Sequence, residues 1–268
     1  MIKSSEIKKV ALTNLKGKWP KAFAITTLFT IVNIALSYVL TVLQNITVNM
    51  PILYYGVNLI YLAIFLPLSF GLISSICKLV KEEKINTTTF LNDAILNSTK
   101  AIAIFIRTLL KMLFPSLIII AGITGILFLT INILPLTEAN TSGYAIYIAL
   151  LSFIIFIGIA LSALPYTLST YVLIDNKELK SKEIITQSSI LMNNNRWNFV
   201  KLIFSFIGWI LLIAVLSTTI SLLTFEAASN YVQWFGMIFL MPYIIASISV
   251  FYEETLNTIE TVSENTKN

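Results

Sequence analysis

The sequence contains no histidine and only one cysteine, Cys77, among its 268 residues. Without histidine the chain has no imidazole base, no imidazole metal ligand and no Ser-His or Cys-His nucleophile pair. A single cysteine forms neither an intrachain disulfide nor a cysteine metal cluster. We therefore expect a protein that is not an enzyme and that has no catalytic residue, no metal site and no cofactor.

Motifs that couple a protein to chemical energy are also missing. The chain has neither a Walker A sequence nor a dinucleotide fingerprint, and its long apolar runs lack the carboxylates that usually carry protons across membranes. We interpret the remaining carboxylate pairs as solvated ends beside lysines: Glu82 with Glu83, Asp175 with Glu178, and Glu253 with Glu254. A membrane enzyme that acts on lipid through these carboxylates is the least favoured alternative.

Charge as a whole is scarce, because 12% of the residues are charged and 57% are hydrophobic, with a mean hydropathy of +0.85. This balance is far from that of a soluble domain. A helix that spans a bilayer needs about 20 apolar residues. Six runs without Asp, Glu, Lys or Arg reach that length: 22–43, 52–77, 112–135, 144–174, 202–225 and 231–252. The predicted fold is therefore all-α, a polytopic membrane protein with six transmembrane helices.

The distribution of basic residues predicts the orientation. Lysine and arginine fall before the first span, after the second, after the fourth and in the C-terminal tail, whereas the loops 44–51, 136–143 and 226–230 contain none. Basic loops stay on the cytoplasmic side, so both termini are predicted to be cytoplasmic. The formal net charge of +5 then favours the anionic lipids of the inner leaflet as partners, and no nucleic acid.

The even-numbered spans share a proline at one distance from the charged end that follows. The pairs are Pro67 with Lys78, Pro165 with Asp175, and Pro242 with Glu253. At about 1.5 Å per residue the separation is about 15 Å, which is close to the midplane of a hydrocarbon core about 30 Å thick. Each proline also frees the carbonyl four residues earlier, on Ala63, Leu161 and Ile238.

This pattern predicts one membrane domain, 1–254, built from three parallel repeat units of about 1–84, 85–179 and 180–254, and followed by a polar cytoplasmic tail, 255–268. Each unit would contain an amphipathic interfacial helix, an ascending span and a descending span with the proline. The interfacial helices are expected at 5–16, from Thr87 or Thr88 onward, and from Ser181. Gly17 is expected to end the first of them in a left-handed conformation.

Small residues four positions apart predict close helix contacts within the spans. The pairs are Gly71 with Ser75, Ala121 with Gly125, and Gly158 with Ser162. Aromatic and basic residues at span entrances predict anchors at the level of the lipid headgroups: Trp19, Arg196 and Trp197.

The prolines allow two interpretations. In the first they only bend helices so that six spans can pack. In the second they border a polar midplane pocket formed by Pro67, Pro165, Tyr166, Pro242 and Tyr243, with hydroxyl groups nearby on Ser69, Thr167 and Ser247.

Several segments together resemble the family of bacterial integral membrane proteins called domain of unknown function 975. These segments are LKGKW ending at Trp19 after Ala11, YVLIDN at 171–176, LM at 191–192 leading to Arg196 and Trp197, SFIGW at 205–209, and PY at 242–243 followed by FYEE at 251–254. The resemblance covers nearly the whole chain. It implies a multi-pass protein of the bacterial plasma membrane, and it implies no activity.

The favoured function is therefore a non-enzymatic integral membrane protein that binds a lipid, a hydrophobic small molecule or a partner membrane protein. The alternative is a transporter or export component with a midplane site at the kinked even-numbered helices. A continuous polar cavity at the depth of the three prolines would favour transport, and a dry, close-packed centre would oppose it.

Overall fold

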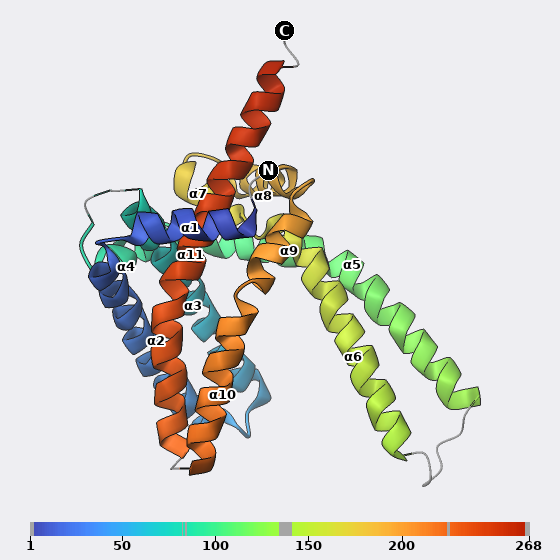
Figure 1. Ribbon diagram of the computed structural model, residues 1–268. Helices are drawn as coiled ribbons and strands as arrows, with labels where there is room; N and C mark the ends of the chain where they lie inside the picture. The colour runs from blue at the N-terminus through green and yellow to red at the C-terminus, as the bar shows by residue number, and fades with distance from the viewer. Residues whose placement is uncertain (1–2, 82, 84, 134–140, 224–225, 266–268) are drawn as a thin grey trace.

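The computed structural model describes residues 3–81, 83, 85–133, 141–223 and 226–265, and within these ranges all regular secondary structure is helical (Figure 1). The elements in chain order are α1 (Ser4–Leu15), α2 (Trp19–Thr47), α3 (Pro51–Val80), α4 (Thr89–Leu96), α5 (Ser98–Ile133), α6 (Thr141–Ala163), the 3₁₀ helix η2 (Leu164–Tyr166), α7 (Ser169–Asp175), α8 (Ser181–Met192), α9 (Arg196–Phe204), α10 (Ile207–Leu223) and α11 (Glu226–Asn265).

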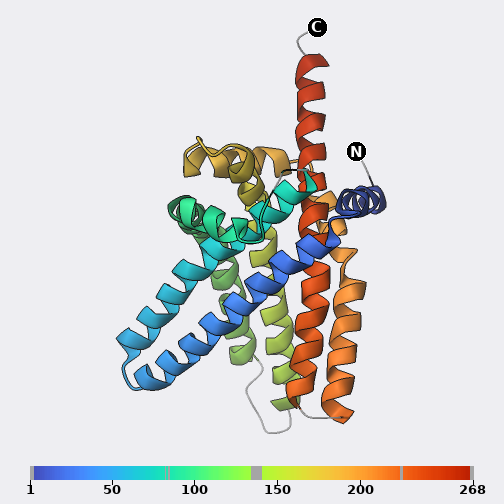
Figure 2. The same cartoon turned by 90° about the vertical axis from the view of Figure 1, so that its left-hand side faces the viewer.

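Six helical segments are long and apolar enough to cross a membrane, which confirms the predicted number. They are Trp19–Thr47, Pro51–Val80, Ser98–Leu129, Tyr147–Asp175, Arg196–Leu223 and Tyr231–Ile259. The short helices α1, α4, α7 and α8 gather at one end of the molecule, and the hairpins α2–α3, α5–α6 and α10–α11 diverge from that end (Figures 1 and 2). This arrangement indicates a multi-pass membrane protein.

The helix ends follow local sequence rules. Pro20 and Pro51 occupy the first positions of α2 and α3, where a missing backbone N–H costs no helical hydrogen bond. The side chain of Glu6 accepts a hydrogen bond of 3.2 Å from the backbone N–H of Lys3. Gly17 has a φ of 79°, so the predicted left-handed end of the first short helix is confirmed.

The buried core lies where the short helices meet the adjoining ends of α3 and α11. Its largest fully buried side chains are Leu15, Ile25, Leu72, Ile76, Phe90, Leu168, Leu173, Ile184, Ile185, Met192, Phe206 and Tyr252. The far halves of the hairpins expose most of their apolar side chains, such as Tyr55, Phe128 and Phe156. Hydrocarbon would cover those side chains in a bilayer.

Each short helix that precedes a hairpin packs against another part of the molecule. α1 packs against α11, α4 against α3, and α8 against η2 and α7. The contact of α8 includes a hydrogen bond of 3.0 Å from the hydroxyl group of Ser188 to the carbonyl oxygen of Pro165. Because α1 packs against α11, the first and last of the described helices are in direct contact.

Glycine allows two of the expected close approaches. A Cβ on Gly71 would lie 2.1 Å from the carbonyl oxygen of Phe90 on α4, and a Cβ on Gly158 would lie 2.9 Å from a methyl group of Ile119 on α5. These two contacts confirm the prediction from small-residue spacing. The same prediction is wrong for Gly125, because no neighbouring atom lies within 4 Å of the Cβ position there.

Two spans differ from their predicted limits. The third was expected to begin at Met112, and α5 begins at Ser98 and continues through Pro115, so the expected second surface segment and the third span belong to one helix, whose first part lies across the end where the short helices gather (Figure 1). The fifth was expected to be continuous, but it is interrupted between α9 and α10. At this break the N–H groups of Ser205 and Phe206 donate to the carbonyl groups of Leu202 and Ile203, three residues earlier, which tightens the turn.

Candidate functional site

The three even-span prolines are buried on separate elements, and they differ in their effect on the helix. Pro67 and Pro242 lie inside the continuous helices α3 and α11, whereas Pro165 lies in η2, after α6 has ended at Ala163. Of the three freed carbonyls, that of Ile238 has a neighbour that can donate, the hydroxyl group of Thr26 at 3.3 Å. The same hydroxyl lies 2.9 Å from the carbonyl of Ala22, so its single proton is shared between them.

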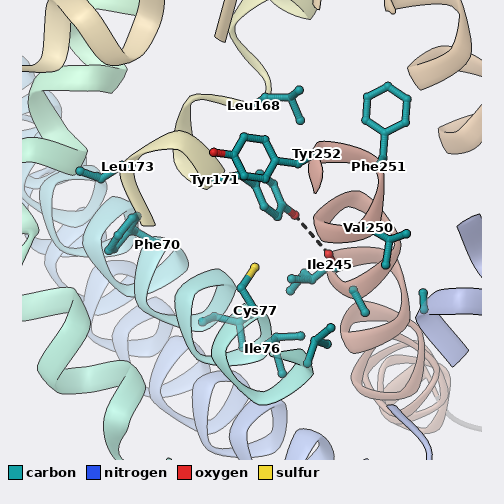
Figure 3. Close-up of a cluster of buried hydrophobic side chains, with 14 of the residues drawn as sticks. Phe70, Ile76, Cys77, Leu168, Tyr171, Leu173, Ile245, Val250, Phe251 and Tyr252 are labelled. Carbon is teal, nitrogen blue, oxygen red and sulfur yellow. Dashed lines mark hydrogen bonds between the residues drawn. The ribbon is translucent and has the colours of Figure 1, made fainter. Parts of the chain in front are cut away.

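The space between α3, α7 and α11 is filled by side chains. Figure 3 shows the hydroxyl group of Tyr171 pointing at the backbone of Ile245, to which it donates a hydrogen bond of 3.4 Å. Cys77 lies beside them and is 2% exposed, and the rings of Tyr171 and Tyr252 are 6.0 Å apart. The centre of the described structure is therefore packed, and the predicted site residues do not meet there in one cavity.

An ion-pair cluster closes this core at the ends of the three helices. The ammonium group of Lys81 lies 2.8 Å from a carboxylate oxygen of Asp175 and 3.6 Å from one of Glu253. Burial alone would lower the pKa of Lys81, but its hydrogen bond with Asp175 and the two negative charges raise the pKa above its ordinary value. Both carboxylates lie beside a lysine, as predicted, and they hold α7 and α11 to the end of α3.

Tyr166 lines a cavity of about 250 Å³ between α3, α5 and the η2–α7 segment. Besides Tyr166, five hydroxyl-bearing residues share this lining: Ser69, Thr108, Thr167, Ser169 and Thr170. The hydroxyl groups of Ser69 and Thr167 donate to backbone carbonyls of their own helical segments at 2.8 and 2.9 Å, so their oxygens are left as acceptors. The ammonium group of Lys111 lies 5.4 Å from the centre of the Tyr166 ring and adds a positive charge nearby.

Tyr243 lies elsewhere, in an open groove of about 780 Å³ between α2, α10 and α11, which we name the aromatic groove. Its lining contains no charged residue. The lining consists of Leu12, Trp19, Phe23, Trp209, Leu212, Ile213, Leu216, Tyr231, Val232, Phe235, Gly236, Phe239, Leu240 and Tyr243. Two residues predicted for different roles, Trp19 as an anchor and Tyr243 as a pocket residue, are thus brought into one groove.

The floor of the aromatic groove has a regular sequence pattern that the sequence analysis missed. Tyr231, Phe235, Phe239 and Tyr243 recur at every fourth position of α11, which places them along one face. The Phe239 ring lies 4.3 Å from that of Phe23, which closes the α2 side. A Cβ on Gly236 would lie 2.8 Å from the Ile213 side chain, so glycine at this position lets α10 pack directly on α11.

α1 covers one end of the aromatic groove. Figure 2 looks along α1 and shows it above α10 and beside α11, and Leu12 of α1 contributes to the lining. The ammonium group of Lys8 donates a hydrogen bond of 3.3 Å to the carbonyl oxygen of Ser205 and lies 5.1 Å from the centre of the Phe206 ring. These contacts fix α1 to the break between α9 and α10.

A third cavity of about 600 Å³ lies between α2, α3 and α11, and Thr30, Asn33 and Ser37 contribute to its lining. These residues belong to a polar stripe along α2 that the sequence analysis also missed: Thr26, Thr30, Asn33, Ser37, Thr41 and Gln44. The spacing of three or four residues places them on one helix face. At the far end of the stripe the side-chain amide of Gln44 donates to Asn58 of α3 at 2.9 Å.

The remaining predicted residues are the anchors. Arg196 and Trp197 are both exposed, and 70% of the surface of Trp197 is accessible. Among the described residues, no group of three or more histidine, cysteine, aspartate or glutamate side chains could hold a metal ion. The concave features that the described residues form are the apolar grooves and the hydroxyl-lined cavity.

Comparison with known proteins gives one match. The family model described as "Protein of unknown function (DUF975)" matches residues 1–258. No curated protein and no solved structure matches the chain.

Proposed function

The chain belongs to the DUF975 family of proteins of unknown function, and from this premise we propose that it is a non-enzymatic membrane protein that holds a lipid or another apolar molecule in the aromatic groove. The observation that carries the proposal is the groove itself. It is open, has a volume of about 780 Å³ and a lining without charged residues, and lies between helices long enough to cross a membrane. A concave apolar surface with few polar groups is the usual form of a site for such ligands.

The proposal includes an orientation. Both termini lie in the cytoplasm, and α1, α4 and α8 rest on the inner leaflet of the plasma membrane. The gathering of the short helices at one end (Figure 1) supports this orientation, because α1, α8 and the segments that connect the short helices contain lysines and anionic headgroups attract them. Arg196 and Trp197 project from this end as exposed side chains, as interfacial anchors would.

The threefold repeat is part of the proposal, and α1 and α8 support it. Both start with the same arrangement, in which a glutamate accepts a hydrogen bond from a lysine N–H three residues earlier: Glu6 from Lys3 and Glu183 from Lys180. The buried faces also correspond, with Ile7, Ala11 and Leu15 in α1 and Ile184, Ser188 and Met192 in α8. Each of the two helices then packs on the end of a preceding or following hairpin.

Mass measurement of the intact protein in mild detergent tests whether the groove is occupied. We expect the wild-type protein to retain an apolar molecule or lipid, and a variant in which Val232→Phe and Leu216→Phe fill the groove to lose it. The matched control places the same phenylalanines on an exposed part of α6, with Ile148→Phe and Ile154→Phe, which are 49% and 53% exposed. Equal retention by the filled and control variants would refute the proposal.

Transport is the second candidate function, and the cavity beside Tyr166 favours it. That cavity presents hydroxyl oxygens from α3 and α7 to its interior. An alternating-access site is reached from each side of the membrane in turn. Single cysteines at Thr167 and Thr170, in a Cys77→Ala background, should then react with impermeant maleimides added on either side. Reaction from one side only would exclude this mechanism for the cavity.

A further inference from the structure

We propose that the aromatic groove holds one acyl chain of an anionic phospholipid and that the phosphate of this lipid lies against Lys9 of α1 and Lys16, the residue that follows α1. The inference rests on the proposed function, since it needs the groove to hold an apolar chain. It adds the identity of the ligand class and the residues that select its headgroup.

The charge at the groove entrance carries the inference. Leu12 contributes to the groove lining, and Lys9 and Lys16 are three residues before it and four residues after it. Residues at this spacing share one side of a helix, so the two ammonium groups flank the covered end of the groove. Both lysines are exposed, and within the described residues no carboxylate forms an ion pair with either of them.

Two other lysines of this segment, Lys8 and Lys18, are engaged with backbone carbonyl groups, which distinguishes them from the proposed pair. Lys8 donates to the carbonyl oxygen of Ser205 at 3.3 Å, and Lys18 donates to that of Val80 at 3.3 Å. Lys9 and Lys16 therefore combine an exposed positive charge with a position beside an apolar groove. A lipid with a negative headgroup and an apolar chain has the complementary pair of properties.

The groove extends as deep as one acyl chain reaches. Pro242, next to Tyr243, lies about 15 Å along α11 from Glu253 at 1.5 Å per residue, which equals the half-thickness of about 15 Å of the hydrocarbon core. A chain that starts beneath α1 would therefore extend along the groove to about Tyr243. Trp19 and Trp209 contribute to the same lining, and indole rings favour the depth of the headgroups.

A transmembrane helix of a partner protein fits this groove less well. A helix with its side chains is about 10 Å across, whereas Gly236 lets the Ile213 side chain of α10 pack directly on α11, so these two helices leave no room for a third between them at this level. A partner helix would also leave the charges of Lys9 and Lys16 without a counterion unless it carried acidic residues at its end.

Fluorescence quenching by brominated lipids tests the inference. In a protein whose only tryptophan is Trp209, with Trp19, Trp197 and Trp234 replaced by phenylalanine, dibrominated acyl chains quench the indole when they occupy the groove. We compare dibrominated phosphatidylglycerol with dibrominated phosphatidylcholine in the same vesicles. The expected result is a preference for phosphatidylglycerol that falls about five- to thirtyfold in the double variant Lys9→Gln and Lys16→Gln.

The matched control removes the same charge elsewhere on the cytoplasmic side, with Lys177→Gln and Lys182→Gln, and should leave the preference unchanged. The inference is overturned if the wild type shows no preference for phosphatidylglycerol or if the double variant Lys9→Gln and Lys16→Gln keeps that preference. It is also overturned if the control variant loses the preference to the same extent. Quenching no greater than that of an exposed tryptophan would indicate another occupant, such as a partner helix, and would also overturn it.

The groove-filling variant with Val232→Phe and Leu216→Phe separates the two levels of the proposal. If both lipids quench Trp209 equally and filling the groove abolishes the strong quenching, the proposed function holds and the headgroup inference fails. If filling the groove changes nothing, the proposed function fails as well.

Discussion

The α-carbon of Gly71 on α3 faces the backbone carbonyl oxygen of Phe90 on α4, and a Cβ at position 71 would lie 2.1 Å from that oxygen. A backbone atom cannot move aside as a flexible side chain can, so only glycine allows this crossing. Phe90 itself is fully buried, and its ring lies 6.4 Å from that of Phe29 on α2. This one contact therefore joins three helices.

Replacing Gly71 with alanine should destabilise the protein. We expect the free energy of unfolding to fall by about 1–3 kcal/mol, because the new methyl group forces α4 away from α3. Unfolding in detergent, followed by circular dichroism, measures the change. The control is Gly125→Ala, where a Cβ meets no neighbouring atom. Equal stability of the two variants would contradict the close crossing.

Asp93 should be the most sensitive carboxylate of this region. Its oxygens accept hydrogen bonds from the hydroxyl group of Ser74 at 2.8 Å and from the ammonium group of Lys78 at 2.8 and 2.6 Å. The side chains of Lys78 and Asp93 are only 15% and 7% exposed. Asp93→Ala leaves the lysine buried without its partner and should cost about 3 kcal/mol of unfolding free energy.

The double variant Lys78→Met and Asp93→Leu provides the control for that prediction. Because it removes both charges, it should recover a large part of the stability lost in Asp93→Ala. Thermal unfolding of the wild type and both variants in the same detergent gives the comparison. A double variant less stable than Asp93→Ala would show that the ion pair is not the source of the effect.

The ion pairs of Lys81 should make stability depend on pH in the alkaline range. Since its pKa in the folded protein is raised above the ordinary value of 10.5, the charged lysine stabilises the fold at pH values below 10.5, and this contribution disappears as the pH rises through the raised pKa. We expect the melting temperature of the wild type to exceed that of Lys81→Gln at neutral pH, and the difference to vanish in strong alkali. A difference that persists there would refute the assignment.

Topology can be tested with one cysteine. Residue 140 lies outside the described residues, in the loop that the sequence places on the extracellular side, so Asn140→Cys in a Cys77→Ala background should react with an impermeant maleimide added to intact cells. A cysteine at Lys177, on the opposite side, should react only after the cells are opened. The reverse pattern would overturn the proposed orientation.

The number of spans was predictable because hydrophobic length alone determines it, and Gly71 was predictable because its spacing to Ser75 is a local pattern. The limits of α5 were harder to predict. Arg107 and Lys111 suggested that the third span begins after them, but they could not show that one continuous helix begins at Ser98 and contains both the surface segment and the span.

The candidate site could not be derived from the prolines, because their depth along the chain says nothing about which helices lie between them. Tyr166 and Tyr243 follow equivalent prolines but line different cavities. The aromatic residues of α11 at every fourth position were available in the sequence. Their meaning depended on α10 packing at Gly236, which is a contact between distant segments that periodicity does not reveal.

The contact between α1 and α11 has a consequence for biosynthesis. Among the described helices, α1 is synthesised first and its main partner, α11, is synthesised last. Before the sixth span is inserted, the apolar face formed by Ile7, Ala11 and Leu15 has only the smaller contacts that α1 makes with α3 and α9. A chain truncated before α11 would therefore leave part of this face uncovered by protein and open to recognition by cellular quality control.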